Sequence, residues 1–150
     1  MTDVQFRSGF EGHEHVLPVR VYYEDTDFTG VVYHAGYLRF FERGRTEFLR
    51  AAGVEHSALL SLSDPCAFAV TRIGVQFHKA ARVDDVLEIR TRYRRGKGVR
   101  ILARQRAVRG GDLIAEAEVE VVCIRLDGRP RRPPPELSER IAPFLAAATP

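Results

Sequence analysis

Two acidic residues and a histidine lie close together in one short segment near the start of the chain. Asp25 and Asp27 flank a threonine, Gly30 follows, and His34 comes seven residues after Asp27. A carboxylate and an imidazole can move protons, and a carboxylate can also attack a carbonyl carbon. Asp-x-Asp is also common in turns, because its side chains bond to nearby backbone. The spacing therefore leaves two hypotheses open, a reactive site and a structural turn.

A basic run without a single acid forms a second set of candidates. Its members are Arg90, Arg92, Arg94, Arg95, Lys97, Arg100, Arg104, Arg106 and Arg109. Guanidinium groups suit phosphate oxygens, so the run indicates an anionic partner. Alternatively, these charges line the solvated face of a strand. The formal net charge of the whole chain is only +3, which does not by itself indicate nucleic acid.

The elements around the acidic segment would hold it between a strand and a helix. Residues 17–23 alternate and are rich in β-formers, which predicts a strand, and residues 24–36 contain turn residues and two glycines, which predict a loop. From Tyr37 to about Ala52 apolar residues recur every three or four positions, and Gly53 is typical of a helix end. The unpaired amides at the start of this helix would favour negative charge beside the acidic segment.

Gly44 interrupts the apolar stripe of the predicted helix, which contains Tyr37, Phe41, Phe48 and Ala51. A glycine in mid-helix costs up to about 1 kcal/mol relative to alanine. We therefore expect the sheet to approach the helix backbone closely at Gly44.

After residue 66 the period of the apolar residues changes to two, which predicts a meander of antiparallel strands. The sets expected to share a face are Ala67, Ala69, Thr71, Ile73, Val75 and Phe77; Leu87, Ile89, Thr91 and Tyr93; Val99, Ile101, Ala103 and Ala107; and Leu113, Ala115, Ala117, Val119, Val121 and Cys123. One long helix and about five strands predict an α+β domain with the helix on one face of the sheet. We expect a tail at 1–16, the domain at 17–128, and a Pro/Arg-rich segment with a short helix (about Glu136 to Ala146) at 129–150.

Length and composition fit one domain with its own core. The chain has 150 residues, of which 45% are hydrophobic. Cys66 and Cys123 do not form a Cys-x-x-Cys motif, so we expect buried, reduced thiols and no metal site. No stretch approaches the ~18 consecutive apolar residues of a membrane span, and the first residues lack the apolar block of a signal peptide. These features predict a soluble, cytoplasmic protein.

The segment VRVYYEDTDFTGVVYHAGYLRFFERGRTEFLRAAG, residues 19–53, resembles the opening of the hotdog-fold acyl-CoA thioesterases of the 4-hydroxybenzoyl-CoA thioesterase type. Within that group it looks most like the bacterial branch associated with the Tol-Pal envelope system. The likeness continues through FAVTRIGVQFHKAARVDDVLEI and AEAEVEVVCI, and so covers about residues 17–130. Its central motif is Tyr-Glu-Asp-Thr-Asp followed by Gly-Val-Val-Tyr-His. Two positions depart from the close relatives, Phe28 where small residues are usual and Gly36 where asparagine is frequent.

The resemblance implies a hotdog fold, in which a five-stranded antiparallel sheet wraps around one long central helix, with a short C-terminal helix added. It also implies a homo-oligomer, a dimer or tetramer paired edge to edge, with active sites between protomers. The family's catalytic carboxylate falls on Asp27. His34 falls where the backbone N–H polarises the thioester carbonyl and the side chain assists, and Tyr23 falls on a tyrosine near that site.

The resemblance also gives the basic run a use. Arg94, Arg95 and Lys97 match a segment with which related thioesterases hold the CoA phosphates. We expect Arg90, Arg92, Arg104 and Arg106 to form a solvated outer face instead.

Other chemically capable residues are better explained by structure. His13 and His15 could form a metal pair, but they lie in the predicted tail, and we expect His56 and His78 to be surface or hydrogen-bonded histidines. Glu42 can pair with Arg45, and Glu47 with Arg43 or Arg50, at helical spacing. With Asp27 present, neither glutamate is needed as the catalytic acid.

The sequence therefore predicts an enzyme that hydrolyses an acyl-CoA thioester to a carboxylic acid and CoA, without a cofactor of its own. Asp27 would act as general base or nucleophile, and both roles stay open, as do the preferred acyl group and the choice between dimer and tetramer. The alternative is a weakly catalytic module that binds acyl-CoA or acyl carrier protein near the Tol-Pal system. A third hypothesis, nucleic-acid binding, is disfavoured because Tyr93 is the only aromatic residue in the basic run.

Overall fold

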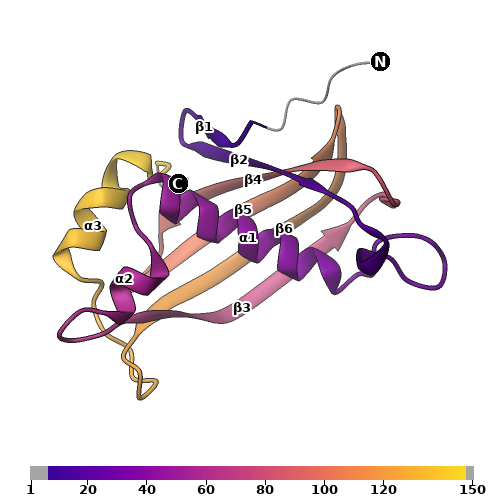
Figure 1. Ribbon diagram of the computed structural model, residues 1–150. Helices are drawn as coiled ribbons and strands as arrows, with labels where there is room; N and C mark the ends of the chain where they lie inside the picture. The colour runs from indigo at the N-terminus through magenta and orange to yellow at the C-terminus, as the bar shows by residue number, and fades with distance from the viewer. Residues whose placement is uncertain (1–6, 148–150) are drawn as a thin grey trace.

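Helix α1 (Gly36–Ala51) lies diagonally across one face of a six-stranded antiparallel sheet, as Figure 1 shows for the computed structural model. The structure describes residues 7–147. In chain order the strands are β1 (Gly9–Glu11), β2 (Glu14–Arg20), β3 (Ala67–Phe77), β4 (Val86–Arg95), β5 (Arg100–Arg109) and β6 (Asp112–Ile124). Their order in the sheet is β1-β2-β4-β5-β6-β3. The predicted α+β class with one long helix on one face is confirmed.

Helix α1 forms where the apolar period predicted it, one residue earlier at each end. Its buried residues are Tyr37, Phe40, Phe41, Gly44, Phe48 and Leu49. Ala51 is exposed, unlike the rest of the predicted stripe. Gly53 follows with a φ of +90°, a conformation that glycine adopts easily and that ends the helix.

The expected close approach at Gly44 is confirmed. A Cβ atom at this position would lie 2.6 Å from Ile89 Cγ2 and 2.9 Å from Thr91 Oγ1, so the sheet leaves no room for a side chain. The fully buried Gln105 amide donates to the Phe41 carbonyl (2.7 Å) and to the Thr91 hydroxyl (2.9 Å). Helix and sheet are thus joined by hydrogen bonds at the helix midpoint.

Strand β3 at the sheet edge differs from the prediction because it contains a bulge. Its register with β6 shifts between Val70 and Arg72, so Thr71 is an extra residue. Phe68 and Val70 therefore share the inner face with Ile73, Val75 and Phe77, and the predicted assignment of Ala67, Ala69 and Thr71 to that face is wrong. The Thr71 hydroxyl instead donates to the Glu120 carboxylate (2.6 Å).

The prediction of five strands is also wrong, because β1 and the start of β2 form within the expected tail of residues 1–16. The two strands make a hairpin, with Phe10 paired to His15 in register. The Phe10 ring packs on Phe48 and stacks on Phe144, with centroids 4.9 and 4.4 Å apart. The pattern was hidden because Glu14, a charged residue, is buried here together with His15 and Val16.

The C-terminal segment folds back over the last turns of α1 (Figure 1). Helices α2 (His56–Leu60) and α3 (Pro135–Ile141) lie at this end, followed by a 3-10 turn, η2 (Ala142–Phe144). The α-helix is shorter than predicted, since Pro143 has no N–H to continue it. The Ala146 N–H donates to the Tyr93 carbonyl (2.8 Å) and ties the segment to β4. Within residues 7–147, no helix is long and apolar enough to cross a membrane.

Candidate active site

The acidic segment forms a tight loop against the start of α1. A 3-10 turn, η1 (Tyr23–Asp25), leads into it, and Thr26 then pairs with Val32 in an isolated antiparallel bridge. The Asp27 N–H donates to the Val31 carbonyl at 2.9 Å. The loop therefore folds back on itself, and it stands at the N-terminal end of α1 in Figure 1.

Both aspartates of the motif hold this turn together, as the structural hypothesis predicted. The Asp25 carboxylate accepts the Tyr22 N–H at 2.8 Å. One Asp27 carboxylate oxygen, Oδ1, accepts both the N–H (2.8 Å) and the hydroxyl (2.6 Å) of Thr29. The Thr29 hydroxyl, followed by its N–H, lowers the pKa of Asp27. Because its pKa is lowered, the Asp27 carboxylate is anionic at neutral pH, and because the residue is exposed, the carboxylate is accessible.

Just before and at the start of α1, some backbone N–H groups donate to carbonyls of the chain and others do not. The Gly36 N–H donates to the Tyr33 carbonyl (2.7 Å), and the Leu38 N–H to the Ala35 carbonyl (3.1 Å). The N–H groups of His34 and Ala35 have no acceptor in the described part of the chain. The positive end of the helix dipole adds to their preference for a negatively charged oxygen.

The two predicted aromatic site residues differ in their surroundings. The His34 ring lies against Tyr33 (centroids 4.5 Å apart) and meets Phe77 edge-on at 6.3 Å. Tyr23 is 85% exposed, and its hydroxyl makes no hydrogen bond with residues 7–147. In one chain, Asp27, His34 and Tyr23 thus share one small loop region, but no hydrogen bond or ring contact joins their side chains.

The structure does not bring the predicted phosphate-binding residues to this loop within one chain. Arg20 pairs with Val86 at the start of β4, next to η1, whereas Arg94 and Arg95 end the same strand. At about 3.3 Å per residue, the two ends of β4 are roughly 30 Å apart. Arg95 and Lys97 are exposed, and neither they nor Arg94 form an ion pair with the described residues.

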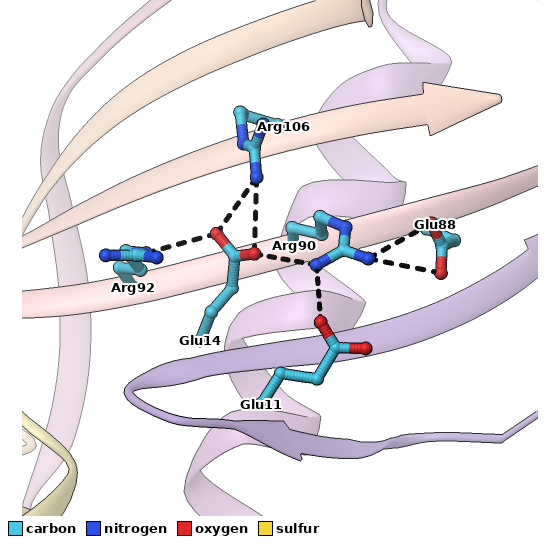
Figure 2. A network of polar contacts seen from close by, with 6 residues as sticks. All are labelled: Glu11, Glu14, Glu88, Arg90, Arg92 and Arg106. Atoms are coloured by element: carbon cyan, nitrogen blue, oxygen red, sulfur yellow. Dashed lines mark hydrogen bonds and ion pairs between the residues drawn. The ribbon is translucent and has the colours of Figure 1, made fainter. Parts of the chain in front are cut away.

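Three other arginines of the basic run converge on one buried acid, Glu14. Figure 2 shows this cluster on the sheet face away from α1. Arg90 Nη1 lies 2.8 Å from Glu14 Oε1, while Arg92 Nε and Arg106 Nη2 each lie 3.2 Å from its carboxylate oxygens. Burial raises the pKa of Glu14, but the three arginines outweigh burial and leave the pKa lowered. The expected outer face is therefore solvated at Arg92, Arg104 and Arg106, whose side chains are 53%, 66% and 43% exposed, whereas Arg90 is only 18% exposed; ion pairs to acidic residues join all four to this side of the sheet.

Sequence reasoning missed two residues beside the loop that contains Asp27. Thr29 holds Asp27, and the Asp-x-Thr spacing was a signal that could have identified it. Arg82 pairs through its backbone with Val31 and exposes its side chain next to the loop. Nothing in the local sequence around Arg82 indicates this contact, because it depends on how the β3–β4 connection meets the loop.

The remaining candidates are divided between the surface and the core. His13 is exposed but His15 is buried, and no group of three metal-binding side chains occurs within residues 7–147. Cys66 and Cys123 are both buried and free. Burial and the neighbouring Cys66 raise the pKa of Cys123 to about 12, so the thiol stays protonated.

The helix glutamates pair only in part as predicted. Glu47 lies 3.4 Å from Arg50, which confirms one of the two options for that residue. The Glu42–Arg45 pair does not form, because Arg45 turns inward to donate to Gln105 Oε1 at 3.0 Å. Glu42 has no ion pair with the described residues.

Comparisons with known proteins agree on the class of fold and activity. The profile of the "Thioesterase-like superfamily" matches residues 21–144. The chain is 46% identical over 110 residues to "Acyl-CoA thioesterase YbgC" of Haemophilus influenzae, covering 73% of this chain and 80% of that protein. It is 47% identical over 108 residues to "Acyl-CoA thioester hydrolase YbgC" of Escherichia coli, covering 71% and 79%.

A solved structure gives the same result in three dimensions. The probable thioesterase from Bartonella henselae superposes with a TM-score of 0.78 at 42% identity, covering 81% of this chain and 99% of that one.

Proposed function

The chain belongs to the thioesterase-like superfamily and is a thioester hydrolase with the hotdog fold, and on that premise we propose that it hydrolyses acyl-CoA to a carboxylic acid and CoA. One observation carries the proposal. The ionised, exposed Asp27 stands in the loop that leads directly to the unpaired amides of His34 and Ala35. The names of the relatives from Haemophilus influenzae and Escherichia coli supply the CoA part of the substrate.

In the proposed reaction, the His34 and Ala35 amides bind the thioester oxygen and stabilise the oxyanion that forms on it. Asp27 then either takes a proton from the attacking water or attacks the carbonyl carbon itself. In the first route the water oxygen bonds to the carbonyl carbon and the carbon–sulfur bond breaks. In the second route an Asp27 oxygen bonds to the carbonyl carbon and the carbon–sulfur bond breaks, which gives a mixed anhydride that water hydrolyses to the acid and free Asp27. CoA leaves as its thiol, protonated by Asp27 in the first route and by water in the second, and His34 and Tyr23 orient the reacting groups.

We propose that the working form pairs two copies through the exposed edge of β3, as dimer or tetramer. Inner-face side chains of this strand are uncovered: Val70 is 49% exposed, Ile73 37% and Phe77 50%. A second copy would bury this apolar row and continue the sheet. Phe77 contacts His34, so a second copy packed against β3 would lie next to the loop that contains Asp27.

The phosphate role of Arg94, Arg95 and Lys97 depends on such an assembly, because they lie far from Asp27 in one chain. Replacing all three with glutamine should raise the KM for CoA esters at least about tenfold and leave kcat nearly unchanged, since the phosphates lie far from the reacting carbon. An unchanged KM would remove them from the binding site.

The direct test of the function is release of CoA thiol from short-chain, medium-chain, long-chain and aromatic acyl-CoAs. We expect steady turnover with at least one group, and light scattering should show a dimer or tetramer. Failure to release CoA from any of these esters would contradict the proposal.

A binding role for acyl carrier protein, with or without the Tol-Pal system, stays a second prediction. Pulldown of acylated carrier protein, compared with the unacylated form, tests it. Retention without thiol release would favour the binding module over the enzyme.

A further inference from the structure

A pocket of about 250 Å³ lies between the second half of α1, the inner face of the sheet and the C-terminal segment. Phe48 and Leu49 of α1, Val70 of β3, and Ile141 and Leu145 of the C-terminal segment form apolar walls. This volume is below the roughly 300–1,000 Å³ of pockets that hold a whole small ligand. The pocket therefore suits one end of a larger molecule.

Polar groups with unused hydrogen-bonding capacity reach into this apolar space. Arg45 lines the pocket, and its only hydrogen bond to the described residues is the one from Nη1 to Gln105. Tyr93 is 5% exposed, yet its hydroxyl has no hydrogen-bond partner within residues 7–147. Glu42 adds an unpaired carboxylate to the same lining. A ligand that brought hydrogen-bonding capacity here would satisfy groups that the protein leaves open.

A row of apolar side chains connects the reactive loop to this pocket. Phe77 contacts both His34 and Tyr37 at the start of α1, with ring centroids 6.3 and 5.6 Å apart. Ile73 and then Val70 continue along the inner face of β3, and Val70 lines the pocket. All three are partly exposed in one chain. In the proposed dimer the second copy covers this row, so the acyl chain would lie between the row and the partner copy.

The distance between the two places suits an acyl chain of medium length. Arg45 comes nine residues after Gly36, which corresponds to about 13 Å of helix. Long side chains on a helix lean back toward its N-terminus, which shortens the gap that the acyl chain must span.

Resting on the proposed function, we propose that this pocket receives the far end of the acyl group, and that Arg45 and Tyr93 select acyl groups ending in a hydroxyl over plain alkyl chains. The hydroxyl accepts hydrogen bonds from the Arg45 guanidinium and the Tyr93 hydroxyl, and donates to Glu42. A terminal carboxylate is the poorer ligand, because it would face the Glu42 carboxylate. Arg45 and Tyr93 are thus specificity-determining residues at a distance from the reacting carbon.

The test compares octanoyl-CoA, ω-hydroxyoctanoyl-CoA and octanedioyl-CoA, and the same three derivatives of decanoyl-CoA, as substrates of the 150-residue protein. We expect kcat/KM of the wild-type protein to be roughly tenfold or more higher for the ω-hydroxy ester than for the alkyl ester at one or both lengths. The difference should lie in KM, because the contact is the same before and during reaction.

Tyr93→Phe and Arg45→Met should each reduce this preference to within about twofold. Arg45→Met leaves Gln105 Oε1 without its donor and can lower stability. Tyr93→Phe removes only a hydroxyl that bonds to no described residue, so it tests the inference without that loss. Arg43→Met changes the same residue type on the exposed side of α1 and should retain the wild-type preference.

Equal kcat/KM for the alkyl and ω-hydroxy esters, a preference for the dicarboxylic ester, or a preference unchanged in both variants would overturn the inference. Failure of the proposed function is distinguishable from all three results, because the wild-type protein would then release no CoA from any ester.

Discussion

Asp27 and Glu14 are two acids with lowered pKa values in opposite surroundings. Glu14 is 6% exposed, and three arginines bond its carboxylate on the outer face of the sheet. Asp27 is exposed in a loop, where Thr29 is the main donor to its carboxylate. Glu14 is therefore fixed by charged partners from other strands, whereas Asp27 is held only by its own turn.

The difference indicates what each charge is for. A buried carboxylate with all its partners in place stabilises the strands that supply them, here β2, β4 and β5. An exposed carboxylate beside unpaired amides contributes little to stability but can act on a bound carbonyl. Changing each acid should therefore move a different measured quantity, activity for Asp27 and stability for Glu14.

The largest expected effect is on turnover. Asp27→Asn keeps the size of the side chain and an oxygen that can accept from Thr29, so the protein should fold normally. Loss of the base or nucleophile should lower kcat for acyl-CoA hydrolysis by roughly 100-fold to 10,000-fold. Thiol release measures the rate, and circular dichroism checks the fold. Near wild-type turnover would remove Asp27 from the mechanism.

Glu14→Gln should instead act on stability. Removing one member of a buried ionic cluster leaves its partners uncompensated, and because Arg92 and Arg106 are about half exposed, we expect a loss of about 2 kcal/mol in the free energy of unfolding. Glu118→Gln is the matched control, because the Glu118–Arg104 pair on the same sheet face is about two-thirds exposed and should contribute less than about 1 kcal/mol. Urea unfolding measures both. Equal losses would contradict the contrast between buried and exposed acids.

Acidification should reduce the contribution of Glu14 to the free energy of unfolding. Because the folded-state pKa of Glu14 is lowered, its contribution is complete above the ordinary glutamate pKa of about 4.3 and is lost as the pH falls through the lower folded value. The difference in unfolding free energy between the wild-type protein and Glu14→Gln should therefore shrink as the pH falls in that window. If the difference grew on acidification, the arginines would not be lowering the pKa of Glu14.

The smallest effect is expected at Thr29. Thr29→Val removes the hydroxyl donor to Asp27 but keeps the backbone N–H, so the pKa of Asp27 should rise. The acidic limb of the kcat/KM profile should move to higher pH, and kcat should fall about twofold to fivefold as Asp27 loses its fixed orientation. Thr26→Val serves as control, because the Thr26 hydroxyl donates to the Tyr23 carbonyl and not to the Asp27 carboxylate. If the acidic limb did not move, the group that titrates in the kcat/KM profile would not be Asp27.

Sequence reasoning predicted the elements whose signals are local. The helix from Gly36 to Ala51 follows from its apolar period, and the close approach at Gly44 follows from the cost of glycine in a helix. The hydrogen bonds with which Asp25 and Asp27 hold their turn follow from the Asp-x-Asp spacing. These features depend on residues a few positions apart, and so one sequence contains them.

Features that depend on distant partners were not predictable in the same way. Glu14 looked like a tail residue, because only the fold brings Arg90 and Arg106 to it. The bulge at Thr71 reversed the face of Phe68 and Val70, since one extra residue shifts a period of two. Arg45 was expected to be able to pair with Glu42, but it donates to the buried Gln105 instead.

The seat of Gly44 on the sheet has a mechanical consequence. With Ile89 and Thr91 filling the place of a side chain, and Gln105 bonded to the Phe41 carbonyl, α1 cannot slide by one residue without pushing a bulky neighbour into the strands. Packing and hydrogen bonding at the midpoint of α1 thus fix the position of the helix on the sheet. Under the proposed placement of the acyl group, the fixed position of α1 sets the distance between the loop that contains Asp27 and the far pocket.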